Sequence, residues 1–241
     1  MEPPALRSVA VLGLGEAGSA IAQDLAARGV QVLGWDPVVR EVPGVVRAEG
    51  PVQAVQGADA VLSVNAARVA LDVARQLAAH LRPGQLFCEL NTASPALKRA
   101  VAEVVEGSGA LFVDVALMAP VPGRGIRTPA LVSGRGAELF ARYFRPLGMP
   151  VEVVDETPGT AAARKLLRSV FMKGLAACVL EGLQAAERLG WGEWYRQELA
   201  ATLREADEQL LERLISGSRK HAARRLHEMT AAAELLLSLG V

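Results

Sequence analysis

Ser8-Val-Ala-Val-Leu-Gly-Leu-Gly-Glu-Ala-Gly-Ser-Ala-Ile-Ala-Gln-Asp-Leu-Ala-Ala-Arg-Gly29 is the stretch that decides the fold of this chain. Its apolar run ends at Gly13, further glycines follow at Gly15 and Gly18, and apolar residues then recur at helical spacing. The pattern predicts a buried strand, a glycine turn and a helix. In such a turn the first glycine permits a tight bend, the second lets the backbone approach a pyrophosphate, and the third allows close helix–sheet packing.

The segment after the glycine turn completes a dinucleotide-binding fingerprint. A second apolar run, Val30–Trp35, ends in Asp36, 18 residues beyond Gly18. An acidic residue at this place accepts hydrogen bonds from the adenosine ribose, and the N-terminus of the helix attracts the phosphates. The alternative is a glycine-rich turn that binds no cofactor. We predict a dinucleotide site whose turn residues are Gly13, Leu14, Gly15, Glu16, Ala17 and Gly18.

The composition indicates a soluble globular protein with a small ligand. Among 241 residues 51% are hydrophobic, and 26 basic residues balance 26 acidic ones, so the charge favours neither nucleic acid nor a membrane surface as a partner. The cysteines and histidines lack metal-ligand spacing, so we expect no metal, and we expect Cys88 and Cys178 to be buried. The absence of a signal peptide and of a transmembrane run leads us to expect a cytoplasmic protein.

Strand signals and helical segments alternate up to residue 156, where the composition changes. This alternation predicts a Rossmann-type doubly wound parallel sheet, an α/β domain over residues 1–156. Residues 157–241 are predicted to form a small all-helical domain, with a long interdomain helix from about Pro158 to Leu189 and two further helices, Glu193–Ile215 and Arg219–Leu239. Their leucines offer more apolar surface than so small a domain buries, so we expect a homodimer through these helices.

Gly13-Leu-Gly-Glu-Ala-Gly-Ser-Ala-Ile-Ala resembles the opening motif of the β-hydroxyacid dehydrogenases, the superfamily of 3-hydroxyisobutyrate and 6-phosphogluconate dehydrogenases. Glu89-Leu-Asn-Thr-Ala-Ser-Pro95 is similar to the family segment beside the nicotinamide. Met118-Ala-Pro-Val-Pro-Gly-Arg124 resembles its substrate loop, and Gly159-Thr-Ala-Ala-Ala-Arg-Lys165 the stretch with its catalytic lysine. The resemblance covers residues 8 to about 190 and is greatest for a poorly characterised subgroup of 6-phosphogluconate-dehydrogenase-like oxidoreductases.

The resemblance implies hydride transfer between NAD(P) and the CH–OH group of a small β-hydroxyacid, with Lys165 as the general acid/base. A lysine serves this purpose near neutral pH only where burial lowers its pKa, and the neighbours of Lys165 are apolar. Ser169, four residues on, matches a family position that usually holds a substrate-binding asparagine. The alternative for Lys165 is an exposed lysine on a long helix.

The substrate loop departs from the family pattern. Pro122 replaces a serine that holds the substrate carboxylate, and Arg124 replaces a second glycine. Arg124 and Arg127 either grip a carboxylate or phosphate in its place or face water. The expected substrate-binding residues are Pro122, Gly123, Arg124, Arg127 and Asn91. Two other functions stay open: an imine or ketone reductase on the same scaffold, and a dinucleotide-binding protein without catalysis.

The choice of cofactor depends on charged residues after the second strand. Asp36 repels a 2′-phosphate and so favours NAD, but Arg40 can neutralise this repulsion, which leaves NADP open. Asn65 and Thr92 follow two successive strands, at the carboxyl ends where a dinucleotide lies in such sheets. Each of them is alternatively a turn or capping residue.

Overall fold

The computed structural model describes residues 5–241 and divides into two compact units. The first unit extends to Arg168, and the second comprises Ser169–Val241. The division falls inside the long helix α6, Thr160–Arg188, whose first turn is bonded to the sheet of the first unit. The boundary at residue 156 inferred from composition marks the end of the last strand, which stops at Asp155.

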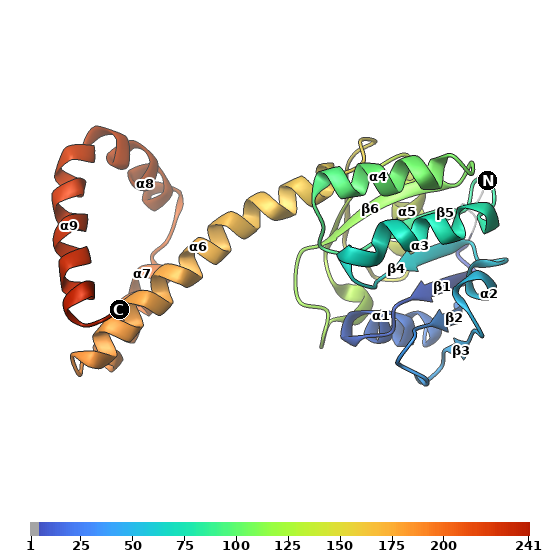
Figure 1. Cartoon of the computed structure of the whole chain (residues 1–241), viewed down its shortest axis with the longest axis horizontal. Helices are drawn as coiled ribbons and strands as arrows, with labels where there is room; N and C mark the ends of the chain where they lie inside the picture. The colour runs from blue at the N-terminus through green and yellow to red at the C-terminus, as the bar shows by residue number, and fades with distance from the viewer. Residues whose placement is uncertain (1–4) are drawn as a thin grey trace. The chain divides into compact units, whose positions relative to one another are not determined.

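An eight-stranded sheet forms the centre of the first unit (Figure 1). Its strands are Ser8–Leu12 (β1), Gln31–Trp35 (β2), Val46–Arg47 (β3), Ala60–Ser63 (β4), Leu86–Glu89 (β5), Leu111–Leu117 (β6), Ala130–Ser133 (β7) and Val151–Asp155 (β8). Their order across the sheet is β3-β2-β1-β4-β5-β6-β7-β8. The direction of chain progression reverses between β1 and β4, and ligands bind at such a switch point in open α/β sheets.

The predicted parallel sheet is confirmed, apart from one antiparallel pair. Strands β1 to β6 pair in parallel, whereas β7 runs antiparallel to β6. The connection between β6 and β7 contains only a 3₁₀ turn, Gly125–Arg127, in place of a covering helix. A parallel pair needs a crossover, usually a helix, so this loop returns the chain in the opposite direction.

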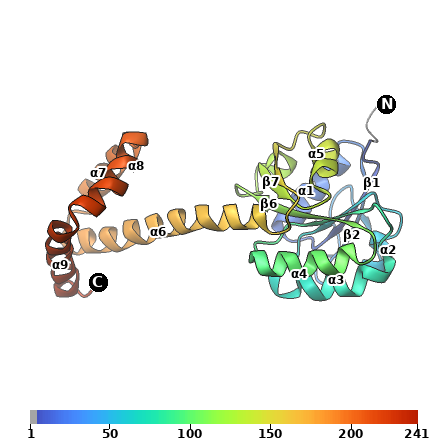
Figure 2. The same cartoon turned by 90° about the horizontal axis from the view of Figure 1, so that it is seen from above.

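Helices cover both faces of the sheet (Figure 2). One face carries α1 (Glu16–Ala26) and α5 (Ala137–Phe144), and the other carries α2 (Pro51–Val55), α3 (Ala70–Leu77) and α4 (Pro95–Glu106). Two further 3₁₀ turns, Ala67–Val69 and Ala78–His80, flank α3. Successive side chains of β1 alternate between the two cores, as the two-residue period of a strand requires.

The glycine turn between β1 and α1 is held by close backbone contacts. Gly13 has φ +101°, in the left-handed region, and its N–H donates to the carbonyl of Trp35 at 2.9 Å. A Cβ atom on Gly18 would collide with the carbonyl oxygen of Gly13. At Gly15, by contrast, a Cβ would meet no protein atom within 4 Å. Gly13 and Gly18 are thus required by the fold, whereas the space above Gly15 is open to a ligand.

The second unit is helical, but its helices differ from the prediction. After α6 it contains three helices, where the sequence predicted two: α7 (Gly192–Arg204), α8 (Glu208–Lys220) and α9 (Ala222–Ser238). Asp207 caps α8 by accepting a hydrogen bond from the N–H of Leu210 at 2.9 Å, which starts a new helix at this point. The expected break at 216–218 lies inside α8, where both serine hydroxyls donate to carbonyls one turn back.

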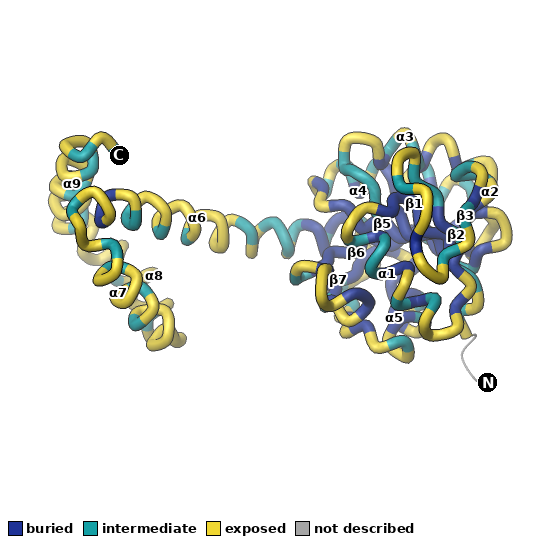
Figure 3. The backbone as a smooth tube through the Cα atoms, turned by 90° about the horizontal axis from the view of Figure 1, so that it is seen from below, coloured by how far each residue is buried: buried dark blue, intermediate teal, exposed yellow. Residues whose placement is uncertain are grey.

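The second unit buries few of its residues (Figure 3). Within the described residues 169–241 only Ala185 and Ala186 are buried. Cys178, which was expected to be buried, is exposed on α6, whereas Cys88 is buried in β5. None of the helices in residues 5–241 has both the length and the apolar character needed to cross a membrane.

We predict that Gly18→Ala destabilises the first unit by about 1–3 kcal/mol, because the new methyl group overlaps backbone that cannot move aside. Gly15→Ala is the matched control, since its methyl group enters open space. Urea unfolding of the full-length variants measures both effects. Equal midpoints for the two variants would contradict the assigned packing role of Gly18.

Candidate active site between the glycine turn and Lys165

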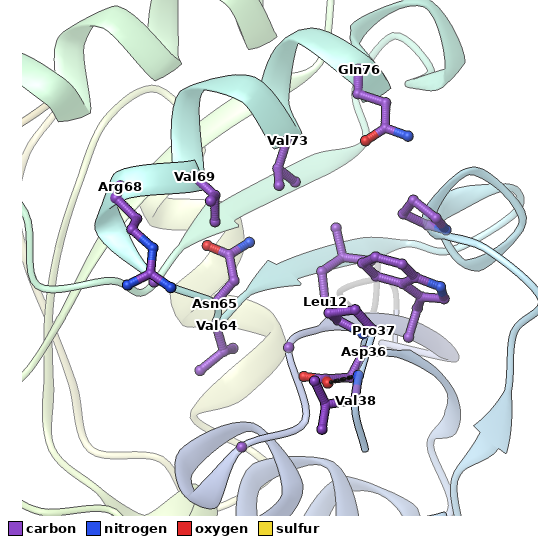
Figure 4. Close-up of a pocket in the computed structure, with 15 residues that line it drawn as sticks. Leu12, Asp36, Pro37, Val38, Val64, Asn65, Arg68, Val69, Val73 and Gln76 are labelled. Atoms are coloured by element: carbon purple, nitrogen blue, oxygen red, sulfur yellow. Dashed lines mark hydrogen bonds between the residues drawn. The ribbon is translucent and has the colours of Figure 1, made fainter. Parts of the chain in front are cut away.

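A cavity of about 500 Å³ lies beside the glycine turn (Figure 4). Figure 4 shows Arg68, Val69, Val73 and Gln76 on one side of it and Asp36, Pro37 and Val38 on the other. Trp35 and Pro51 complete a largely apolar wall. The cavity thus combines flat apolar surfaces with one carboxylate, which suits an aromatic base attached to a ribose.

The carboxylate of Asp36 is fixed by the backbone around it. It accepts hydrogen bonds from the N–H groups of Leu14 at 2.8 Å, Val38 at 2.8 Å and Val39 at 2.9 Å. Burial raises the pKa of Asp36, but these N–H groups and the charge of Arg47 outweigh it, so its pKa lies below the usual value. The N–H of Leu14 therefore binds Asp36 and ties the glycine turn to the end of β2.

Three arginines in this part of the chain differ in their relation to the cavity. Arg40, which the sequence suggested as a partner for a 2′-phosphate, is exposed and is not among the cavity residues. Arg68, which follows β4, lines the cavity and was not foreseen. A role for Arg47 was likewise not predicted. Its guanidinium donates to the backbone carbonyls of Asp36, at 2.7 Å, and of Val39.

A second cavity, of about 430 Å³, adjoins the first one. The two share Gly15, Val64 and Asn65 as lining residues. The second cavity is further lined by the start of α1, the ends of β5 and β6, and α6: Glu16, Ala17, Gly18, Leu90, Asn91, Thr92, Leu117, Ala119, Pro120, Val121 and Lys165. An extended ligand can therefore run from one cavity to the other across Gly15, past the unpaired N–H groups at the start of α1.

Lys165 stands at the second cavity, on the first turns of α6. Its Nζ donates a hydrogen bond to the hydroxyl of Thr92 at 2.9 Å. Burial lowers the pKa of Lys165, and the nearby charge of Lys98 acts in the same direction, whereas Asp114 and Glu89 oppose the shift. Lys165 therefore reaches its neutral form at a lower pH than an exposed lysine does, which is what proton transfer near neutral pH requires.

Asn65 and Asn91 are brought together at the ends of adjacent strands. The Asn91 amide donates to Asn65 Oδ1 at 2.8 Å and to the carboxylate of Glu89, and the Asn65 amide donates to the hydroxyl of Ser63 at 3.1 Å. This chain of bonds fixes both amides beside the shared wall of the two cavities. Sequence reasoning placed Asn65, Asn91 and Thr92 at this edge of the sheet, and the structure brings all three together there.

A buried cluster of charges behind Lys165 was missed by sequence reasoning. Lys98 of α4 forms ion pairs with Glu89 and, at 2.9 Å, with Asp114, and all three side chains are at most 1% exposed. Burial raises the pKa of Glu89, and Lys98 and Asn91 compensate only in part. The available signal was a charged residue at the end of the apolar strand β5, another inside the apolar strand β6, and a lysine on the apolar face of α4.

The residues predicted to bind substrate in the loop after β6 are placed differently. Pro122, Gly123, Arg124 and Arg127 are exposed and are not among the residues that line the second cavity. The loop is held to α1 by a bond from the N–H of Ile126 to Asp24 at 2.8 Å. The substrate roles of these four residues remain predictions. Ser169 begins the second unit, one turn beyond Lys165 on α6, and its role likewise remains a prediction.

Two family models match parts of the chain. The NAD-binding domain of 6-phosphogluconate dehydrogenase matches residues 8–126, which contain the glycine turn and the ends of β5 and β6 that line the second cavity. A domain of unknown function, DUF1932, matches residues 186–241, most of the second unit.

Individual relatives extend the match over almost the whole chain. A conserved protein of unknown function, whose structure was described as similar to 3-hydroxyacid dehydrogenases, is 31% identical, and the alignment covers 96% of this chain and 90% of that one, with a TM-score of 0.68. The probable 3-hydroxyisobutyrate dehydrogenase of Mycobacterium tuberculosis is 27% identical over 194 residues, which are 77% of this chain and 66% of that protein. An imine reductase of Streptomyces aurantiacus shares the fold at 20% identity, with a TM-score of 0.78 and coverage of 98% and 89% of the two chains.

These matches agree with the local geometry, in which a glycine turn, an acidic residue after β2 and a lysine at the start of α6 surround two adjoining cavities. The chain belongs to the β-hydroxyacid dehydrogenase superfamily and has its NAD(P)-binding domain.

Proposed function

We propose that this protein is an NAD(P)-dependent dehydrogenase or reductase that interconverts a small β-hydroxyacid and its oxo form, with Lys165 as the general acid/base. The observation that carries the proposal is the junction of the two cavities at Gly15, with Lys165 in the second one. The first cavity suits an adenosine and the second a nicotinamide together with a small substrate.

The chain's own groups fit such a dinucleotide. The open space above Gly15 and the N–H groups at the start of α1 would hold the diphosphate, because a helix N-terminus attracts anions. Trp35, Pro37 and Val69 would enclose the adenine, with Asp36 beside the ribose. When bound, the nicotinamide accepts or supplies the hydride.

Lys165 would manage the proton in this reaction. During oxidation the neutral amine removes the proton of the substrate hydroxyl, and during reduction the ammonium returns it to the carbonyl oxygen. Thr92 holds Nζ toward the cavity by its hydrogen bond of 2.9 Å. Since burial lowers the pKa of Lys165, the neutral amine forms at a lower pH than in a solvated lysine.

An imine or ketone reductase is the second candidate. It is favoured by the lining of the second cavity, in which the structure gives Lys165 as the one cationic side chain. A substrate carboxylate would therefore have to share Lys165 or recruit Arg124 or Arg127, both of which are exposed. Assays of 3-hydroxy acids, cyclic imines and ketones with NAD and NADP separate the two functions.

We expect Lys165→Ala to lower turnover of the accepted substrate about 10²–10⁴-fold, the usual contribution of a general acid/base, while dinucleotide affinity stays within a few fold. Lys173→Ala is the matched control, because Lys173 is an exposed lysine on the same helix. Steady-state kinetics and fluorescence titration with NADH measure the two quantities. Turnover retained in Lys165→Ala would refute the assignment of the lysine.

We propose NAD as the preferred cofactor, because the ionised carboxylate of Asp36 lines the adenosine cavity and would repel a 2′-phosphate. Titration is expected to give tighter binding for NADH than for NADPH.

Gly15→Ala should weaken the binding of both cofactors severalfold without loss of stability, since its methyl group occupies the space of the diphosphate. Tighter binding of NADPH would overturn the preference, and unchanged affinity in Gly15→Ala would overturn the placement of the diphosphate.

We also propose that a second copy of this chain covers the helical unit. Leucines and other large apolar side chains of this unit are exposed, among them Leu180, Leu203, Leu211, Leu214, Ile215, Leu226, Met229, Leu235 and Leu237. A helical unit with two buried residues lacks a core of its own, and extensive exposed apolar surface marks a site of protein association. A twofold partner supplies the same apolar helices in return.

Light scattering coupled to size-exclusion chromatography should therefore give twice the chain mass of 25.4 kDa at micromolar concentration. Leu211→Glu combined with Leu214→Glu should shift the protein toward the monomer, because it places charges on the apolar surface. Glu208→Gln on the same helix is the matched control. A stable monomer of the unaltered chain would contradict the proposal.

A further inference from the structure

Lys98 is a lysine enclosed almost entirely by protein. Its Nζ donates to the backbone carbonyl of Glu89 at 2.8 Å and lies between the carboxylates of Glu89 and Asp114. The side chain is 1% exposed, so water contributes little to its solvation. Removing two carboxylates and an ammonium from water is costly, and an ion cluster of this kind is often no more stabilising than apolar packing. Stability alone is therefore a weak explanation for this cluster.

Asp114 connects the cluster to the helix that carries Lys165. One carboxylate oxygen of Asp114 pairs with Lys98, and the other accepts the N–H of Ala162, in the first turn of α6, at 2.8 Å. The next N–H back, that of Ala161, donates to the hydroxyl of Ser133 at 3.1 Å. Lys165 lies three residues beyond Ala162, so these bonds set the position from which its side chain starts.

The two lysines also face the same narrow space. Lys98, Asp114 and Lys165 line a gap that has no room for a water molecule. Charges that lack intervening water interact strongly, because the local dielectric constant is low. Charged groups from three other elements influence Lys165: Lys98 of α4, Glu89 of β5 and Asp114 of β6. Thr92 after β5 and Glu16 of α1 line the second cavity together with it. On its own helix the neighbouring Arg164 pairs with Glu152.

We propose that Glu89, Lys98 and Asp114 form a positioning cluster for Lys165, in which Asp114 anchors the first turn of α6 and the ammonium of Lys98 lies across the narrow gap that Lys165 also lines. Lys98 does not line the second cavity, which would hold the substrate. It therefore acts through Lys165 and not on the reacting atoms. The catalytic meaning of this cluster rests on the proposed function of Lys165, whereas its electrostatic effect on the amine does not.

The test measures the titration of Lys165 directly in the full-length chain without cofactor. The rate at which acetic anhydride acetylates Lys165 is followed by mass spectrometry across pH, since only the neutral amine reacts. Three variants are compared with the unaltered chain: Lys98→Met, Asp114→Asn and Arg99→Met. The asparagine retains an oxygen that can accept the Ala162 N–H, and Arg99 is the exposed neighbour of Lys98 on α4.

The two cluster variants should shift the titration of Lys165 in opposite directions. Lys98→Met removes the cation and leaves the carboxylate of Asp114, whose other oxygen stays bonded to the Ala162 N–H, so the midpoint moves to higher pH. Asp114→Asn removes an opposing anion, so the midpoint moves to lower pH. Arg99→Met should leave it in place. A general loosening of the structure would shift both cluster variants in the same direction, so this opposition separates an electrostatic role from a purely structural one.

Coincident midpoints, or shifts in the same direction, would overturn the inference. If one cluster variant fails to fold, the direction of the shift in the other still decides. Lys165→Ala kinetics keep the two proposals apart. Retained turnover in that variant together with opposite labelling shifts would refute the catalytic role alone, whereas lost turnover with coincident midpoints would refute the positioning cluster alone.

Discussion

The close approach of α1 to the glycine turn is the contact on which the rest of the site depends. The backbone of Gly18 lies against the carbonyl of Gly13, which in turn lies against Val64 at the end of the neighbouring strand. This packing brings the N-terminus of α1 to the carboxyl ends of β1 and β4, between which the direction of chain progression reverses. Because Gly15 is left open at this point, the two cavities meet there.

A second constraint fixes the opposite side of the site. The buried charges of Glu89, Lys98 and Asp114 join β5, α4 and β6, and Asp114 extends the connection to the start of α6. The same group of bonds thus links two interior strands of the sheet to the helix whose Lys165 lines the second cavity. Fold and chemistry are coupled here, since the polar groups that hold α6 in place are also the charges that surround its lysine.

The sequence predicted the features that a short stretch of chain determines by itself, above all the glycine turn. The spacing of Gly13, Gly15 and Gly18, with Asp36 after the second strand, predicted the turn that the structure contains, because each of these roles is set by backbone conformation. The cluster around Lys98 was not foreseen, since its members come from three separate elements. The antiparallel direction of β7 was not predicted, because it depends on the path of the loop after β6. The start of α8 at Asp207 was also not predicted, because the apolar pattern continues through this capping residue.

The loop after β6, whose substrate role is a prediction, shows that motif spacing alone does not determine where loop side chains lie. Its residues Arg124 and Arg127 are exposed, whereas Arg68, outside any quoted motif, lines the first cavity. Side-chain direction in a loop is set by long-range contacts such as the bond from Ile126 to Asp24, which spacing alone does not reveal.

A crystal structure of the protein with NAD bound tests the central claim most directly, namely that one dinucleotide spans both cavities and ends at Lys165. The account predicts adenosine between Asp36 and Val69, the diphosphate over Gly15 and the nicotinamide in the cavity that Lys165 lines. A dinucleotide bound elsewhere, or one whose nicotinamide lies outside that cavity, would contradict it.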